Sequence, residues 1–234
     1  MIHIPVLLLL LLLPFVGCAG PERSRSRQSQ TADGPRPVDS TAPATDPRPL
    51  ILFLGTSLTA GLGVDPDSAY PALIQRKLDS AGVPLRTVNA GVSGETSAGA
   101  LRRLPALLRD SIRVLVVETG ANDGLRGLDP DSTAANINAL VAQARAHDPA
   151  ITIVLAQMEA PPNMGPRFTA RFRALFPTLA RRERLVLMPF LLEGVGGVDT
   201  LNQDDGIHPT PAGHRVVAAN VWRTLEPLIG ERRQ

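Results

Sequence analysis

Cysteine, lysine and aromatic residues are scarce in this chain, and each shortage excludes a class of protein. Cys18 is the only cysteine among the 234 residues, which excludes an intrachain disulfide and a cysteine-based metal cluster. Aromatic residues make up 3% of the chain, which argues against a stacking platform for sugars or bases. Lys77 is the only lysine, and the arginines that supply the other positive charges are scattered along the chain. We therefore expect no nucleic-acid partner.

The chain is nevertheless long and apolar enough for one folded domain. Hydrophobic residues make up 44% of the sequence, and the formal net charge is only +2. A core of ordinary size is therefore available. We predict that the domain spans residues 50–230, because the segments before it have a different composition.

Residues 1–18 indicate an export signal. An apolar run that is too short for a comfortable membrane span ends at Phe15, Val16, Gly17 and Cys18. This ending resembles a bacterial lipobox, in which the cysteine is lipidated and becomes the mature N-terminus. The resemblance implies a lipoprotein on the periplasmic side of a bacterial membrane, in the outer membrane if the host has one. Phe15 stands where Leu is usual and no Lys or Arg precedes the run, so a plain signal peptide and an uncleaved anchor remain alternatives.

The segment 19–49 is rich in Pro, Ser, Thr and Arg and has almost no apolar side chains to bury. Such a segment cannot offset the entropy that it would lose on ordering. We predict a disordered tether that holds the domain away from a membrane surface.

From residue 50 onward, short apolar runs alternate with amphipathic patterns of helical period. Strands are expected at residues 50–54, 85–89, 114–118, 151–157 and 185–188. Near-continuous apolar runs are typical of strands that are buried on both faces. Helices are expected at residues 71–81, 98–108, 132–147, 167–182 and 211–228, with Pro105 kinking or restarting the second. The alternation predicts an α/β fold with a five-stranded parallel sheet between two helical layers.

Polar residues follow the ends of these predicted strands. Ser57, Gly94 and Asn122 come after the first, second and third strand. Because the carboxyl ends of parallel strands meet at one edge, we expect these residues to converge at a ligand-binding rim. Each segment, taken alone, also fits an ordinary turn.

A serine nucleophile needs a base and an acid that orients the base. His208 follows Asp205 by three residues in the segment DDGIHP. That spacing allows the carboxylate to fold back onto Nδ1 and leaves Nε2 to face a serine. The other histidines are less suitable as a base. His3 lies in the predicted signal, His147 ends a predicted helix, and His214 lies in the first turn of the last predicted helix with no acid placed to orient it.

Donors for a developing oxyanion are available as well. The backbone N–H of Gly94 can approach a substrate closely because no side chain intervenes. The amide of Asn122 and the backbone N–H of Ser57 are further candidates.

Four blocks of this sequence resemble those of the SGNH (GDSL-type) hydrolases: GTSLTAG, NAGVSGETSAGALRRLPALL, VVETGANDGLRGL and DDGIHPTPAGH. They are most similar to the periplasmic branch of multifunctional thioesterases, arylesterases and lysophospholipases, and the resemblance covers about residues 50–228. It implies Ser57 as nucleophile, His208 as general base and Asp205, rather than Asp204, as the orienting acid. It also implies a flavodoxin-like sheet, no metal and no organic cofactor.

The same resemblance places Gly94, Asn122 and the N–H of Ser57 in the oxyanion hole. The sequence departs from the family at one position, since Thr56 stands where Asp usually precedes the serine. A GxSxG elbow is absent because Thr59 replaces its last glycine, which argues against an α/β-hydrolase with the same triad.

These features predict a serine esterase that hydrolyses carboxylic esters, and the resemblance extends its substrates to acyl thioesters or lysophospholipids. A carbohydrate O-deacetylase of the cell envelope and a non-catalytic binding module are the alternatives. In the loop QMEAPPNMGPRF, Met164 is a candidate to lie against an acyl chain, although the loop fits equally well as a cover for the helix that follows. We expect a small-molecule or lipid ester as substrate, and a monomer.

Overall fold

A computed structural model describes residues 46–230. The predicted signal 1–18, with Cys18, and the tether up to residue 45 lie outside the described residues. Within 46–230, no helix is both long and apolar enough to cross a membrane.

All the predicted strands are present, and they form one parallel sheet in the order β2-β1-β3-β4-β5. The strands are β1 (Leu50–Gly55), β2 (Arg86–Gly91), β3 (Ile112–Val117), β4 (Thr152–Ala156) and β5 (Val186–Met188). This is the flavodoxin-like strand order, and the predicted fold class is therefore confirmed. The side chains of β1 are buried along its whole length because it lies inside the sheet with helices on both faces.

One expectation about the strands is wrong. The second strand was expected to be buried on both faces, but most of its residues are partly exposed. β2 is an edge strand that pairs only with β1. It carries Arg86, Thr87 and Asn89, and an edge position lets such polar side chains reach water or surface partners.

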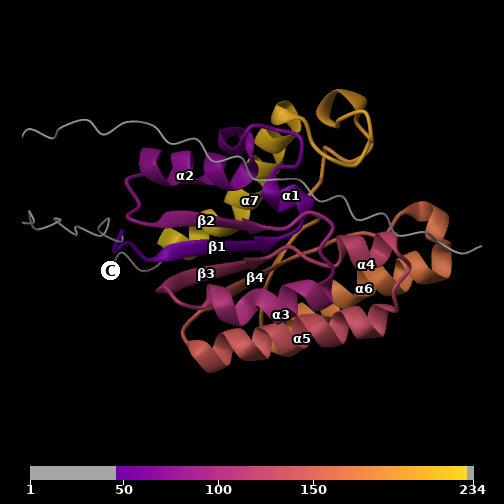
Figure 1. Ribbon diagram of the computed structural model, residues 1–234, viewed down its shortest axis with the longest axis horizontal. Helices are drawn as coiled ribbons and strands as arrows, with labels where there is room; N and C mark the ends of the chain where they lie inside the picture. Colours follow the sequence, from indigo (N-terminus) through magenta and orange to yellow (C-terminus); the bar gives the residue numbers. More distant parts are fainter. Residues whose placement is uncertain (1–45, 231–234) are drawn as a thin grey trace, which may run out of the picture. The chain divides into compact units, whose positions relative to one another are not determined.

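The helices form two layers around the sheet (Figure 1). The α-helices are α1 (Ser57–Ala60), α2 (Tyr70–Ser80), α3 (Ser97–Leu107), α4 (Ala121–Leu125), α5 (Pro130–His147), α6 (Pro166–Glu183) and α7 (Pro211–Gly230). Three 3₁₀ turns are η1 (Pro66–Ser68), η2 (Pro162–Met164) and η3 (Asp199–Leu201). α2 packs beside α7 on one face, and α3, α5 and α6 pack side by side on the other. Pro105 lies in the last turn of a single helix and does not start a new one.

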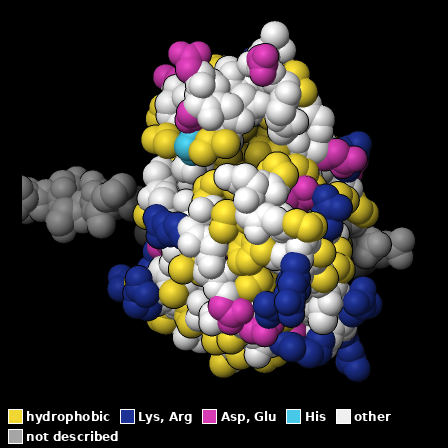
Figure 2. Space-filling view, turned by 90° about the vertical axis from the view of Figure 1, so that its right-hand side faces the viewer, with side chains coloured by type: hydrophobic (Ala, Val, Ile, Leu, Met, Phe, Trp, Pro, Cys, Tyr) yellow, Lys and Arg dark blue, Asp and Glu magenta, His cyan; other side chains and the backbone are white. Residues whose placement is uncertain are grey.

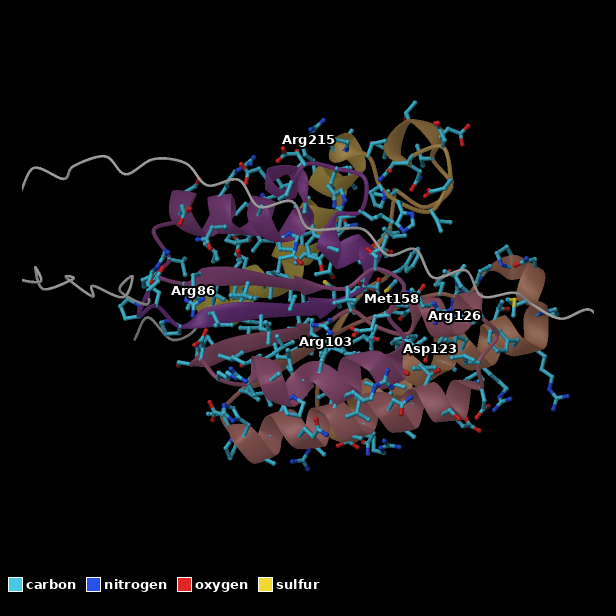
Figure 3. The ribbon with its side chains drawn as sticks, in the orientation of Figure 1. Arg86, Arg103, Asp123, Arg126, Met158 and Arg215 are labelled. Carbon is cyan, nitrogen blue, oxygen red and sulfur yellow. The ribbon has the colours of Figure 1, made fainter. Side chains whose placement is uncertain are left out.

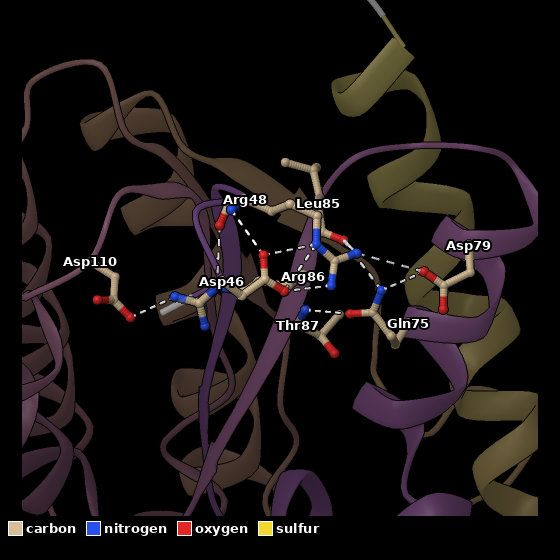
Figure 4. A network of polar contacts seen from close by, with 8 residues as sticks. All are labelled: Asp46, Arg48, Gln75, Asp79, Leu85, Arg86, Thr87 and Asp110. Atoms are coloured by element: carbon tan, nitrogen blue, oxygen red, sulfur yellow. Dashed lines mark hydrogen bonds and ion pairs between the residues drawn. The ribbon is translucent and has the colours of Figure 1, made fainter. Parts of the chain in front are cut away.

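A polar network ties the first described residues to the amino ends of β1 and β2 (Figure 4). Arg48 pairs with Asp46 at 2.7 Å, and its carbonyl oxygen accepts a hydrogen bond from Arg86 at 3.2 Å. Arg86 in turn pairs with Asp110 at 2.7 Å. Arg86 lies at the end of the sheet opposite the segments that follow the strands (Figure 3), so this network stabilises the fold away from the predicted rim.

Candidate active site

Ser57 lies where the buried strand β1 turns into a short helix. β1 ends at Gly55, and Ser57 is the first residue of α1, with 8% of its surface exposed. The turn is tight: a Cβ on Gly55 would lie 1.9 Å from the hydroxyl oxygen of Thr59. Gly61 then ends α1 in a left-handed conformation, with φ of 76°. Ser57 is therefore held at the carboxyl end of β1, between two glycines that the backbone path requires.

The structure brings Ser57, His208 and Asp205 into one chain of hydrogen bonds. His208 Nε2 lies 2.8 Å from Ser57 Oγ, and His208 Nδ1 lies 2.6 Å from Asp205 Oδ2. The other carboxylate oxygen of Asp205 accepts from the backbone N–H groups of Ile207 and His208, each at 3.0 Å. Asp204 contributes none of these bonds. The bond to His208, followed by the two backbone donors, lowers the pKa of Asp205 from 3.8 to about 2, so Asp205 is ionised at neutral pH.

Gln203, which sequence reasoning missed, connects the segment that carries Ser57 with the segment that carries His208. Its side-chain amide donates to the carbonyl oxygen of Leu62 at 2.7 Å, just after α1. Its backbone N–H donates to the carbonyl oxygen of His208 at 2.7 Å. The loop that carries His208 is thereby held against the segment that carries Ser57. A lone glutamine in a loop carries no sequence signal for such a role.

The three predicted oxyanion donors line the same cavity as His208. Gly94 has a φ of 76°, which a residue with a side chain rarely adopts. Arg126 donates to the carbonyl oxygen of Gly94 at 2.9 Å, and the side chain of Asn122 donates to the carbonyl oxygen of Glu95 at 3.0 Å. These bonds fix the loop after β2 relative to α4, and so fix two of the predicted donors relative to each other.

Two buried or half-buried ionic side chains support the same loop (Figure 3). Arg103 of α3 pairs with Glu95 at 2.8 Å and also donates to the carbonyl oxygens of Gly55 and Ala90 at the ends of β1 and β2. Asp123, which is buried, accepts from the backbone N–H and the hydroxyl of Ser97 at 2.8 and 2.6 Å. The predicted rim is therefore pre-organised by hydrogen bonds between segments that are distant in the sequence.

The site opens into a cavity of about 450 Å³. Figure 2 faces the carboxyl ends of the strands and shows hydrophobic side chains gathered around a hollow, with a histidine side chain beside it. Apolar side chains from several loops form much of the lining, namely those of Leu62, Leu125, Met158, Phe190, Leu192 and Ile207. Within residues 46–230, no cluster of three or more His, Cys, Asp or Glu side chains is arranged to hold a metal ion.

Met164, the candidate for a contact with an acyl chain, lies outside the main cavity. Met164 lies in the turn η2 and lines a separate surface hollow together with Phe168 and Arg171. Its methyl group packs against Gly127, where an added Cβ would lie 2.7 Å from it. The methionine of this loop region that lines the main cavity is Met158, directly after β4. The start of the loop thus lines the cavity, and its end covers the beginning of α6.

Two titratable side chains near the site take no part in the hydrogen bonds that link Ser57, His208 and Asp205. His214 is buried, its Nδ1 accepts a hydrogen bond from the backbone N–H of Tyr70, and burial lowers its pKa to about 4. Glu118, directly after β3, is fully buried beside Thr56. Sequence reasoning did not single out Glu118, although a charged residue at the end of a buried apolar run was a visible signal.

The chain is similar to known proteins in sequence and in fold. Residues 53–216 match the model of the GDSL-like Lipase/Acylhydrolase family. Esterase TesA of Pseudomonas aeruginosa is 44% identical over 76% of this chain and 89% of its own length. Thioesterase 1/protease 1/lysophospholipase L1 of Escherichia coli is 37% identical over 76% of this chain and 84% of its own. The crystal structure of the psychrotrophic esterase EstA from Pseudoalteromonas sp., inhibited by monoethylphosphonate, superimposes with a TM-score of 0.73 at 33% identity and covers 76% of this chain and 97% of its own.

Proposed function

Because this chain belongs to the GDSL-like lipase/acylhydrolase family and is a carboxylic-ester hydrolase, we propose a mechanism for that hydrolysis. In it, Ser57, His208 and Asp205 hydrolyse esters through an acyl-enzyme. The observation that carries the proposal is the continuous set of contacts from Asp205 Oδ2 to His208 Nδ1 and from His208 Nε2 to Ser57 Oγ, at 2.6 and 2.8 Å. This is the arrangement that nucleophilic acyl transfer requires.

In the proposed reaction, Ser57 Oγ attacks the carbonyl carbon while its proton moves to His208 Nε2. Asp205 holds the imidazole in the tautomer that accepts there and stabilises the imidazolium. The backbone N–H groups of Ser57 and Gly94 and the amide of Asn122 face the developing oxyanion. His208 returns the proton to the leaving group, and a water activated by His208 then releases the acid and regenerates Ser57.

The cavity supports esters with an apolar acyl group as the substrate class. Its lining is dominated by aliphatic side chains, and several of them, including Leu62, Leu125 and Ile207, are substantially exposed. Exposed apolar side chains around a site favour apolar ligands. Relatives are named as a thioesterase and a lysophospholipase, so we extend the proposal to acyl thioesters and lysophospholipids. Phe190 is the only aromatic residue in the described lining, which argues against a carbohydrate O-deacetylase.

The test combines labelling with a substrate panel. The purified protein is treated with a fluorophosphonate, which reacts with an activated serine, and is assayed on p-nitrophenyl esters of increasing chain length, acyl thioesters, lysophospholipids and acetylated sugars. We expect labelling at Ser57 and hydrolysis of acyl-chain esters, and we expect Ser57→Ala to lose both. Loss of a triad member typically costs about 10⁴-fold or more in kcat. Near-wild-type turnover in Ser57→Ala would exclude the mechanism, and a protein that neither labels nor turns over would be a binding module.

We also propose that the enzyme is exported and anchored through a lipid on Cys18. The support is the apolar run that ends in the only cysteine of the chain, followed by the composition of residues 19–49. Several acyl chains on one cysteine give stable anchoring, whereas one chain gives only marginal binding. Mass spectrometry of the mature N-terminus and fractionation of Cys18→Ser check this. An unlipidated Cys18, or a Cys18→Ser protein that stays fully membrane-bound, contradicts it.

All of the proposed catalytic groups come from a single chain, so we propose that the domain acts as a monomer. Sedimentation of the purified protein at assay concentration checks this, and activity that falls with dilution in step with dissociation contradicts it.

A further inference from the structure

A buried carboxyl group that the proposed mechanism does not use touches the turn before the nucleophile. The carboxylate of Glu118 accepts from the backbone N–H of Thr56 at 2.7 Å and from the Thr56 hydroxyl at 2.9 Å. It also accepts from the hydroxyl of Thr59 at 2.8 Å. Glu118 thus contacts the chain on both sides of Ser57, through Thr56 before α1 and through Thr59 within it.

Glu118, Thr56, Thr59 and Tyr70 form one hydrogen-bonded cluster. When Glu118 is ionised, the direction of each hydrogen bond in the cluster is determined. An ionised carboxylate only accepts, so the single hydroxyl hydrogen of Thr59 points to Glu118. The hydroxyl oxygens of Thr59 and Tyr70 lie 2.6 Å apart, and Tyr70 must therefore donate to Thr59. Every donor of the cluster is then satisfied. If Glu118 takes up a proton, one of its oxygens becomes a donor and a threonine hydroxyl has to turn away.

The carboxylate is packed tightly against the backbone of β1. A Cβ on Gly55 would lie 2.7 Å from Glu118 Oε2. The partners of Glu118 in this cluster are all uncharged, and burial raises its pKa from 4.5 to about 7. The ionised form is therefore costly in the folded protein, and Glu118 gains or loses its proton near neutral pH.

Neighbouring elements bring other titratable or charged groups toward the cluster. Burial raises the pKa of Tyr70 on α2, which keeps its donor proton. His214 on α7 stacks on Tyr70 with ring centroids 6.4 Å apart, and its lowered pKa keeps it neutral at pH 7. Arg103 on α3 donates to the carbonyl oxygen of Gly55 at 3.2 Å and pairs with Glu95. Among these groups of the described chain, Glu118 is the one that changes charge near pH 7.

We propose that Glu118 is a positioning residue for the nucleophile, whose ionised carboxylate holds Thr56 and Thr59 so that the Ser57 Oγ and N–H keep their catalytic geometry. This inference rests on the proposed role of Ser57. Charge-assisted hydrogen bonds are about twice as strong as neutral ones, so protonation of Glu118 loosens the hold on Thr56. Activity then depends on the ionised carboxylate of Glu118 as well as on a neutral imidazole at His208.

The same arrangement explains why threonine is suitable at position 56. The Thr56 hydroxyl lies 2.9 Å from Glu118 Oε1 and donates to it. The aspartate that the SGNH pattern has at this position would place a second carboxylate beside Glu118, and two carboxylates that close cannot both be ionised. Thr56 thereby leaves Glu118 free to carry the charge alone.

The test uses Glu118→Gln, which keeps the size of the side chain but cannot ionise. Its amide oxygen can accept from the Thr56 N–H and the Thr59 hydroxyl, and its NH₂ can donate to the Thr56 hydroxyl. We measure the second-order rate constant of fluorophosphonate labelling at Ser57 between about pH 5 and pH 9. In the wild type we expect a two-step acid limb that is locally steeper than a single ionisation gives, because protonation of Glu118 lowers the rate further. In Glu118→Gln we expect a slope of one and labelling about fivefold to tenfold slower at the alkaline plateau.

Ester hydrolysis provides the second readout. Because the cavity is unchanged, Glu118→Gln is expected to lower kcat and leave KM within about twofold. The matched control is Asp123→Asn, which removes another buried carboxylate at the same sheet edge without contacting Thr56, and the two-step limb should persist in it. If Glu118→Gln does not fold, Glu118→Asp retains the charge on a shorter side chain and should keep the two-step limb at a lower rate.

The outcomes separate this inference from the proposed function. Labelling of Glu118→Gln with the wild-type rate and the wild-type pH profile overturns the positioning role of Glu118 and leaves Ser57 as nucleophile. A single-step limb in the wild type or in Glu118→Asp also overturns it. A wild type that is not labelled at Ser57 instead refutes the proposed function on which the inference rests.

Discussion

Replacing Glu118 by glutamine is expected to stabilise the protein above neutral pH, even though it slows the reaction. Burial raises the pKa of Glu118 from 4.5 to about 7. Between these two pH values the folded protein keeps a proton that the unfolded chain has lost. Stability rises with pH only where the unfolded state binds more protons, and here it binds fewer. The contribution of Glu118 to the free energy of unfolding therefore falls as the pH rises through this window and levels off above it.

The size of the effect follows from that interval. Each pH unit between the folded and unfolded pKa corresponds to about 1.4 kcal/mol, so the interval amounts to about 3 kcal/mol in total. Glu118 is fully buried, so no reduction for solvent screening applies. A glutamine at this position does not titrate and avoids the loss. At pH 8 we expect Glu118→Gln to be more stable by up to about 3 kcal/mol, which corresponds to a Tm higher by about 5 to 10 °C.

The assay is urea unfolding of the full chain, for wild type and Glu118→Gln, at a series of pH values from about 4.5 to 8. Subtracting the two curves of unfolding free energy against pH removes the contributions of groups that titrate in both proteins, including Asp205 and His214. We expect the difference to be near zero at the acid end and to grow in favour of the variant. Parallel curves, or a variant that is less stable at pH 8, would refute the burial argument. The pairing of higher stability with lower kcat would show a charge retained at a cost in stability.

The remaining predictions concern the triad and the cavity. Asp205→Asn should lower kcat by about 10⁴-fold, because the imidazole loses the acid that sets its tautomer, whereas Asp204→Asn should change kcat by less than about twofold. Steady-state kinetics of both variants checks this, and a larger loss in Asp204→Asn would reverse the assignment. Met158→Ala should lower kcat/KM on long acyl chains more than on acetyl esters, since each buried methylene contributes about 0.8 kcal/mol. Met164→Ala is the matched control outside the cavity, and chain-length profiles that are parallel to wild type in Met158→Ala would remove Met158 from the acyl site.

The fold was predictable because its signals are local. Buried parallel strands require apolar runs, and the helices between them require apolar residues at helical spacing, so both can be read along the chain. Every predicted strand lies within two residues of an observed one. The short helices α1 and α4 were not predicted, because four or five residues are too few to show a period.

The sequence by itself determined which residues are chemically suited to the reaction. Asp205 and His208 lie three residues apart, and a contact over that spacing depends mainly on one loop. Ser57 could be named because parallel topology places every strand end at one edge, and the likeness to the SGNH hydrolases identified the same residue.

Only the tertiary structure decided the contacts that depend on side-chain direction and on packing between distant segments. Glu118 meets Thr56 across 62 residues of sequence, and no local pattern records that meeting. Met158 faces the cavity and Met164 packs on Gly127, although both occur in the same loop region. The edge position of β2 likewise depends on strand order, which periodicity does not specify. These contacts depend on how whole elements pack, because the free energy that selects them is shared among residues far apart in the chain.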